Sequence, residues 1–328
     1  MESWETAHAN PKNWPLWKRR ATTLMASLFM LVSPVSSSIV APALPTLQRE
    51  FDIASEPTTQ MILSVFVLSS AIGPLVVSPL SEVYGRQPVL HATMFLFSVF
   101  NLACAFSKTA TQLLVFRFLA GIGGSAPAIG PGILGDCWRS EERGKSLRSY
   151  YIFTLLGPAI GPIVGGFIVR YLHWRWMFYT TTILSAFIQL VGLAVFQETY
   201  PPIIIGNIQS RREHSDQRDE YRRVDPWKVL FQALVRPLRL IGTQFVIQLL
   251  ALYTAFLYGL LYFVLSTYVL VFTGLYHEPP EIATLNYASL AVGFTAGTQI
   301  MALVCDHVSQ WMKKSPFLIR RLSSTRYT

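Results

Sequence analysis

Charged residues are scarce in this chain of 328 residues. Asp, Glu, Lys and Arg together make up 14% of it, whereas 52% of the residues are hydrophobic. A soluble domain ordinarily carries about a quarter charged residues, so the scarcity excludes an ordinary soluble domain and favours a chain that folds in a lipid bilayer. The net charge is +9, but the bases are scattered between apolar runs, so the sequence predicts no nucleic-acid partner.

Cysteine is also rare, and patterns that carry catalysis or metal binding are lacking. Cys104, Cys137 and Cys305 are the only cysteines, and they have neither redox nor metal-ligand spacing. No nucleophile has a neighbouring base, and no glycine-rich phosphate loop opens a helix. The sequence therefore predicts neither an enzyme nor a site for a metal or another cofactor. The N-terminus lacks a signal-cleavage site, and its first apolar run is too long for a signal core, so we expect it to remain as an anchor.

Long stretches without Asp, Glu, Lys or Arg are what the chain has in abundance. Spanning a bilayer takes roughly 20 largely apolar residues, and eight stretches qualify as candidate spans. They are residues 21–48, 57–81, 87–107, 118–135, 149–169, 176–197, 240–277 and 282–305. We expect the fourth span to begin near Gln112, and the seventh to include an extension outside the membrane. The predicted fold class is an all-α polytopic membrane protein.

The spacing of these runs divides the chain into five parts. They are an N-terminal segment (1–20), a six-helix bundle (21–197), a charged loop (198–241), two further helices (242–305) and a basic tail (306–328). Most Lys and Arg residues fall in the end segments and in alternate connections. Because positively charged loops stay in the cytoplasm, this pattern predicts that both termini are cytoplasmic. We expect a multi-pass protein of the plasma membrane.

The fifth run carries glycine at every fourth position, with prolines in between. The residues concerned are Gly157, Pro158, Gly161, Pro162, Gly165 and Gly166. Small residues at this spacing let helices approach closely, and prolines favour bending. The pattern indicates either a static packing surface or, as we favour, a close helix contact that rocks during transport.

A tight turn is predicted between the second and third runs, at Gly85. Glu82 and Arg86 flank it, four residues apart. An unpaired carboxylate at the membrane boundary is costly, so we expect Glu82 to pair with Arg86 or with Arg143 of the next connection on the same side. We assign this motif, Glu82, Gly85 and Arg86 together with Asp136 and Arg143, to conformational gating, and an ordinary interfacial ion pair is an equally good interpretation.

Arg117 is the one charged residue placed well within a predicted span. Burying it costs roughly 2.5–3.5 kcal/mol even on a permissive insertion scale. It either reaches back to the outer surface or, as we favour, faces a water-filled cavity as a substrate or proton-path residue. Gly121, Gly123 and Gly124 follow it and allow another helix or a ligand to approach closely.

Polar and aromatic side chains in the first and seventh runs are candidates for a cavity wall. They are Ser33, Ser36, Ser37 and Ser38 in the first run, and Gln248, Tyr253, Tyr258, Tyr262 and Tyr268 in the seventh. For any single tyrosine, anchoring at the membrane interface is the simpler interpretation. We assign Gln248, Tyr253 and Tyr258, together with Arg117, to the substrate or proton path.

These motifs resemble those of the major facilitator superfamily, and within it the fungal drug:proton antiporters with a twelve-helix plan. Residues 78–87 resemble the loop motif between helices 2 and 3, with Glu82 in place of the usual Asp and with Gly85 and Arg86 retained. Arg117 is similar to the arginine of the helix 4 motif, which is implicated in proton coupling, and residues 157–166 resemble the helix 5 antiporter motif. The further similarities are Asn10 to Trp14, Asp136 with Arg143, and Trp174 to Phe178.

The resemblance implies a two-bundle transporter that exports small organic molecules by alternating access and proton antiport. Drugs, toxins, specialised metabolites or polyamines are the implied substrates, and the proton gradient takes the place of a cofactor. Two helices follow the long loop where the family has six, so we expect the chain to lack helices 9 to 12. A truncated, non-transporting membrane protein and an importer of the same superfamily are the alternatives. The proton-binding residue and the oligomeric state stay open.

Overall fold

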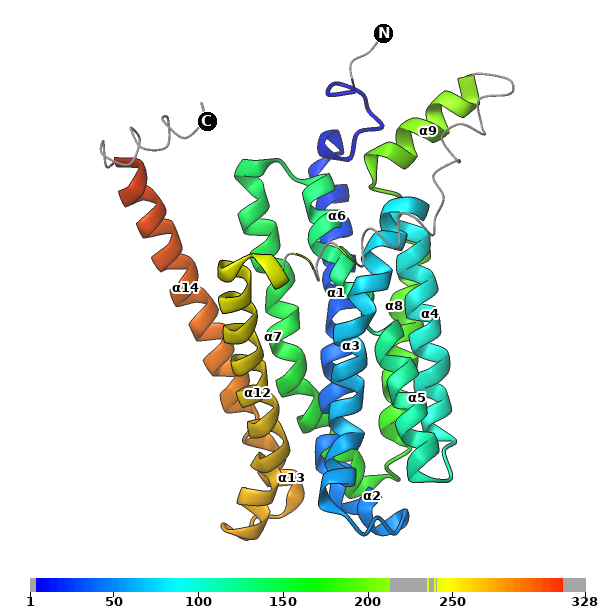
Figure 1. Ribbon diagram of the computed structural model, residues 1–328, viewed down its shortest axis with the longest axis vertical. Helices are drawn as coiled ribbons and strands as arrows, with labels where there is room; N and C mark the ends of the chain where they lie inside the picture. The colour runs from blue at the N-terminus through cyan, green and yellow to red at the C-terminus, as the bar shows by residue number, and fades with distance from the viewer. Residues whose placement is uncertain (1–3, 213–234, 236–238, 240, 315–328) are drawn as a thin grey trace.

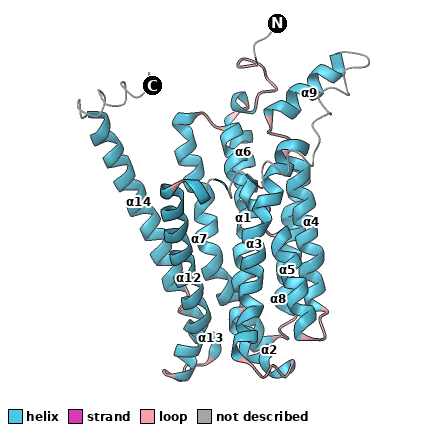
Figure 2. Cartoon of the chain, in the orientation of Figure 1, coloured by secondary structure: helices cyan, strands magenta, loops and turns pink. Residues whose placement is uncertain are grey.

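The computed structural model describes residues 4–212, 235, 239 and 241–314, and the regular elements in these ranges are all helical (Figures 1 and 2). Six long helices form a bundle around α1. They are α1 (Leu16–Ser38), α3 (Glu56–Tyr84), α4 (Arg86–Ala105), α5 (Ala110–Gly123), α7 (Ser140–Tyr171) and α8 (Trp176–Val195). Two more long helices, α12 (Phe245–Gly274) and α14 (Ala288–Lys314), lie beside α7 (Figure 1).

Short helices complete the described elements. They are η1 (Pro11–Asn13), η2 (Ala41–Ala43), α2 (Leu44–Glu50), η3 (Ala126–Ile129), α6 (Gly130–Cys137), α9 (Pro201–Arg212) and α13 (Pro280–Leu285). Six helical segments of the described chain are long and apolar enough to cross a membrane, and α5 is a shorter apolar helix. Each of the eight predicted runs overlaps one of the eight long helices that the structure describes, so the predicted all-α polytopic fold is confirmed.

Prolines divide two of the predicted spans. The first run is α1 followed by η2 and α2, and Pro42 and Pro45 stand at the starts of the two shorter helices. The fourth run is α5 followed by η3 and α6, with Pro131 in the first turn of α6. Proline has no backbone N–H to donate and fits best at a helix start, so it interrupts a run that is continuous by hydropathy.

Helix boundaries differ from the boundaries of the predicted runs because charge marks where a helix leaves the membrane and not where it ends. Helix α1 already begins at Leu16, and α14 continues past Cys305 to Lys314. The loop after the bundle starts with α9, although most of its predicted charged stretch lies outside the described residues. The basic tail from residue 315 onwards also lies outside them.

The core of the bundle consists of two apolar clusters separated by a polar layer. Phe29, Phe66 and Phe97 belong to one cluster, and Leu113 and Phe178 to the other. Along each of α1, α3, α4, α5 and α8, residues of the first cluster lie on one side and residues of the second on the other. The side chains between the two clusters on α1, α4, α5 and α8 are polar and buried: Ser36, Ser37, Asn101, Arg117, Thr181 and Ser185.

Candidate functional site

Arg117 lies at the centre of the polar layer and has no exposed surface. Its Nε donates a hydrogen bond to the Ile62 carbonyl of α3 at 3.1 Å. Its two terminal nitrogens donate to the carbonyls of Ser36 at 3.0 Å and Ser37 at 3.4 Å, both on α1. The guanidinium group therefore ties three helices together through backbone oxygens.

The end of α1 explains why a cation is stable at this depth. Ser36 and Ser37 lie in the last turn of α1, where carbonyls have no partner within the helix and the helix dipole is negative. The ring of Phe66 lies 4.8 Å from the Arg117 guanidinium carbon and adds a cation–π contact. Among the described residues, no carboxylate forms an ion pair with Arg117. A helix C-terminus thus takes the place of a counter-ion.

The glycines after Arg117 permit this arrangement, as the sequence indicates. A side chain at Gly121 would overlap Ser69 and the Phe66 carbonyl of α3. A side chain at Gly123 would overlap the Phe97 backbone of α4. Helix α5 therefore packs closely against α3 and α4 in the turn that follows Arg117.

Asn101 extends the layer from α1 to α8. Its Oδ1 accepts a hydrogen bond from the Ser36 hydroxyl at 3.2 Å. Its Nδ2 donates to Oγ1 of Thr181 at 2.8 Å and of Thr182 at 2.9 Å. Because these buried groups are all paired, the layer fixes the orientation of the segment of α1 that holds Arg117.

Ser37 connects the layer to α12. Its hydroxyl lies 2.9 Å from the hydroxyl of Tyr262, and this contact joins the six-helix bundle to the seventh long helix. Ser37 therefore contacts Arg117 through its carbonyl and Tyr262 through its side chain.

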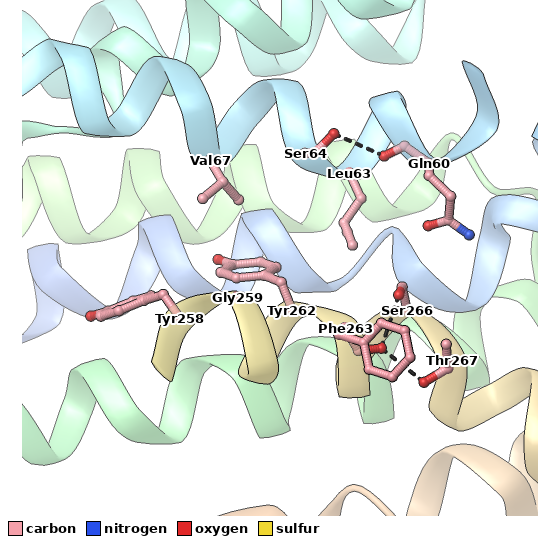
Figure 3. A pocket seen from close by; sticks show the side chains of 10 residues that line it. All are labelled: Gln60, Leu63, Ser64, Val67, Tyr258, Gly259, Tyr262, Phe263, Ser266 and Thr267. Carbon is pink, nitrogen blue, oxygen red and sulfur yellow. Dashed lines mark hydrogen bonds between the residues drawn. The ribbon is translucent and has the colours of Figure 1, made fainter. Parts of the chain in front are cut away.

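A pocket of about 510 Å³ lies next to this contact, between α3 and α12 (Figure 3). Its lining residues are Gln60, Leu63, Ser64 and Val67 of α3 and Tyr258, Gly259, Tyr262, Phe263, Ser266 and Thr267 of α12. The volume lies within the range of roughly 300–1,000 Å³ that small-molecule sites have, and such sites combine apolar walls with a few polar groups. This pocket and the adjoining polar layer are the candidate functional site.

The structure separates the residues assigned from the sequence to a substrate or proton path. Tyr258 lines the pocket, whereas Arg117 is fully enclosed behind Ser37 and reaches neither the pocket nor the surface. Tyr253 is exposed and Gln248 donates to the Ile241 carbonyl at 2.7 Å, so neither lies in the pocket lining. Successive helical positions point in different directions, and only the packing of α12 against α3 selects the face that carries Tyr258 and Tyr262.

The glycine face of α7 packs against α1. Side chains at Gly157, Gly161 and Gly165 would overlap the α1 backbone or side chains between residues 34 and 39. Pro158 and Pro162 are buried within the same uninterrupted helix. The interpretation that this contact rocks during transport stays a prediction, and α1 is the helix against which α7 would move.

Gly166 points away from that face. A side chain there would overlap Thr284 of α13, the short helix that joins α12 to α14. Helix α7 therefore presents one small-residue surface to the bundle and one to the α12–α14 pair.

A second charged cluster lies where α3 ends and α4 begins. Gly85 has a φ of 102° and makes the predicted turn, since this conformation is one that favours glycine. Arg86 pairs with Asp136 of α6 at 3.4 Å and donates to the Ser81 hydroxyl at 2.7 Å. The predicted pair of Glu82 with Arg86 is present but longer, at 3.9 Å, and Glu82 is 58% exposed. The guanidinium of Arg143 lies against Gly135.

Burial raises the pKa of Asp136 to about 6, although the neighbouring Arg86 acts to lower it. Asp136 lies just past the apolar run that ends at Gly135, beyond the membrane-spanning helices. A carboxyl with this pKa changes its protonation near neutral pH, so this ion pair is sensitive to small changes in pH.

Glu198 completes this cluster, and the sequence reasoning missed it. Its carboxylate accepts the backbone N–H groups of Arg86 at 3.0 Å and Gln87 at 3.1 Å, and also those of Thr199 and Tyr200. It therefore caps the start of α4, where Gly85 offers no side-chain cap. The signal that could have found it is the first acidic residue after the sixth run, near a helix that begins without a capping side chain.

Together these features define a multi-pass helical membrane protein with a pocket of about 510 Å³ between a six-helix bundle and a following helix pair. The family model described as Major Facilitator Superfamily matches residues 26–325. The chain belongs to the Major Facilitator Superfamily, which confirms the resemblance seen in its motifs.

Curated fungal relatives cover most of this chain. An uncharacterized transporter of Schizosaccharomyces pombe is 37% identical over 96% of this chain and 66% of its own length. The efflux pump vrtL of Penicillium aethiopicum is 38% identical over 93% of this chain and 61% of its own length. A probable efflux pump of Aspergillus flavus is 38% identical over 83% of this chain and 66% of its own length. The chain thus spans less than two thirds of the length of each of these relatives.

A solved structure of a D-xylose-proton symporter has the same fold. It superposes with a TM-score of 0.63 over 89% of this chain and 69% of its own, at 18% sequence identity. At this identity the likeness concerns the arrangement of helices alone.

Proposed function

We propose that this chain exports small organic molecules across a membrane in exchange for protons, by alternating access. The observation that carries the proposal is the pocket between α3 and α12, whose wall contacts the buried Arg117 layer through Tyr262 and Ser37. Several fungal relatives are named efflux pumps, and the helix 5 glycine motif is similar to that of antiporters, which favours export over import.

Arg117 is the residue that we assign to coupling. A cation that is held by carbonyls and has no carboxylate partner responds to any charge or dipole that enters its surroundings, because the interior screens charge weakly. Movement of α12 would alter the Ser37 contact first and the carbonyl cage of Arg117 next. We assign the Asp136–Arg86 pair to a second, pH-sensitive contact outside the membrane core.

Efflux of the neutral fluorescent dye 7-amino-4-methylcoumarin from cells that express the chain tests this proposal. We expect efflux that stops when an uncoupler collapses the proton gradient and that falls at least tenfold in Arg117→Ala. Val246→Ala, on an exposed face of α12, is the matched control and should retain efflux. Surface amounts are compared by labelling of an epitope tag.

Two outcomes contradict the proposal. Normal surface expression without efflux supports the non-transporting alternative. Dye uptake that is driven by the proton gradient supports an importer instead.

A further inference from the structure

The polar side chains of the pocket use most of their hydroxyl protons inside the protein. Ser64 donates to the Gln60 carbonyl at 3.2 Å. Ser266 and Thr267 both donate to the Phe263 carbonyl, at 3.0 Å and 2.8 Å (Figure 3). A serine or threonine hydroxyl has one proton to donate and two lone pairs that accept. These three side chains therefore offer acceptors, and no donor, to a molecule in the pocket, whereas the other polar groups of the lining, the Gln60 amide and the Tyr258 hydroxyl, can also donate.

Tyr262, like Ser64, Ser266 and Thr267, offers no donor to the pocket, because of how Ser37 uses its own proton. The Ser37 hydroxyl donates to the Pro34 carbonyl at 2.8 Å, so it has no second proton for Tyr262. The 2.9 Å contact between the two hydroxyls must then run from Tyr262 to Ser37. Arg117 holds the Ser37 backbone in place, which fixes this acceptor. Tyr262 thus presents a free lone pair, and no proton, to the pocket.

The charges around the pocket disfavour ions. No Asp, Glu, Lys or Arg is among its lining residues. A cationic ligand would find no carboxylate, and the enclosed positive charge of Arg117 lies behind Ser37. An anionic ligand would meet the lone pairs of Ser64, Tyr262, Ser266 and Thr267.

We propose that the wall of the pocket around Tyr262 prefers uncharged, largely apolar molecules that carry a hydrogen-bond donor, such as neutral phenols and aromatic amines, and that Tyr262 is the residue that sets this preference. The aromatic faces of Tyr258, Tyr262 and Phe263 suit a planar ligand. This inference deepens the proposed function, on which it rests, by naming a substrate class. It disfavours polyamines, which are cationic.

Two matched probes separate a donor from an acceptor. 7-Amino-4-methylcoumarin carries an N–H donor, and 7-methoxy-4-methylcoumarin has a similar size and only acceptors. Both are neutral at pH 7. Their dissociation constants are measured by fluorescence on the full chain in lipid nanodiscs. We expect the amino probe to bind wild type about 3–10-fold more tightly, since one neutral hydrogen bond contributes about 0.5–1.5 kcal/mol.

Two single substitutions should act in opposite directions. Tyr262→Phe removes the acceptor, so the amino probe should lose about 3–10-fold in affinity while the methoxy probe changes less than about twofold. Ser37→Ala releases the Tyr262 proton towards the pocket, so the methoxy probe should gain about 3–10-fold. The gain of the methoxy probe should vanish in the double variant Ser37→Ala/Tyr262→Phe, because the phenol hydroxyl is then absent. Tyr258→Phe is the control: it lines the same pocket without contacting Ser37, and it should not reverse the preference.

A merely structural role for the Ser37–Tyr262 contact would change both probes by the same factor, and that result overturns the proposal. A methoxy gain that persists in the double variant also overturns it. If neither probe binds wild type saturably although efflux of 7-amino-4-methylcoumarin is present, the pocket is not the site and the proposed function stands. If binding follows the expected pattern without efflux, the specificity assignment stands and the transport proposal fails.

Discussion

Helices α1 and α12 are both long, apolar candidates for spanning a membrane, yet their surroundings differ widely. In the segment that contains α1, 72% of the most apolar stretch is buried, whereas in α12 the share is 12%. Hydropathy therefore identifies a helix that enters the bilayer and says nothing of its partners. Lipid is as apolar as leucine, so burial in a membrane is decided by close packing and polar contacts. Those are the features that α1 has and α12 largely lacks.

Charge placement follows the same division. The bundle holds Arg117 at the C-terminus of α1 and Glu198 at the N-terminus of α4, so each charge meets the helix end of opposite polarity. Helix α12 has no charged residue, and its one hydrogen bond to the polar layer is that of Tyr262. Substitutions in the bundle should therefore have large effects, and matched substitutions on the helix pair should have small ones.

The largest difference is expected between two glycines. Gly161→Leu places a side chain against the backbone of α1, including the Val35 carbonyl, and should cost more than about 3 kcal/mol of stability. Gly297→Leu in α14 meets nothing within 4 Å and removes a poor helix former, so we expect no loss. The measurement is the unfolding midpoint in detergent, followed by fluorescence-detected size exclusion. Equal loss in both variants would mean that the helix pair is packed as closely as the bundle.

Arg117→Met should have the next largest effect. It keeps the apolar stem but leaves the carbonyls of Ser36 and Ser37 without donors, at a cost of about 2–4 kcal/mol. Gln248→Met, which breaks a hydrogen bond to the exposed Ile241, should cost less than about 0.5 kcal/mol. The same unfolding midpoints compare the two. A stable Arg117→Met variant would show that the carbonyl cage does not depend on the guanidinium.

The sequence predicted the number of long helices and the position of Arg117 within a helix of the bundle, because both depend on residue type along one segment. It did not predict where proline would split the first and fourth spans, since a charge-free run continues across those prolines. It also did not distinguish Tyr258 and Tyr262, which line the pocket, from Tyr253, which lies outside the lining. That choice depends on how α12 is rotated against α3, and such packing is a tertiary property.

Glu198→Gln tests the capping carboxylate that the sequence reasoning missed. A glutamine oxygen can still accept the N–H groups that bond to Oε1, but its amide nitrogen faces the Gln87 N–H and repels it. We expect a loss of about 1–2 kcal/mol, from one hydrogen bond and the charge at the helix start. Glu82→Gln, whose ion pair is long and exposed, is the control and should lose less than about 0.5 kcal/mol. Equal losses of stability in the two variants would show that the Glu82–Arg86 ion pair stabilises this turn as much as the Glu198 cap does.

The smallest effects test the comparison on apolar side chains alone. Leu113→Ala in α5 removes a fully buried side chain and should cost about 1–2 kcal/mol, because the cavity loses packing contacts while the membrane supplies no transfer term. Leu252→Ala in α12, where the side chain is 70% exposed, should stay within about 0.5 kcal/mol. Unfolding midpoints in nanodiscs give the comparison. A loss at Leu252 that matches the loss at Leu113 would show that another protein surface covers α12 in the membrane. Helix α12 would then differ from the bundle only in which chain or segment supplies its packing contacts.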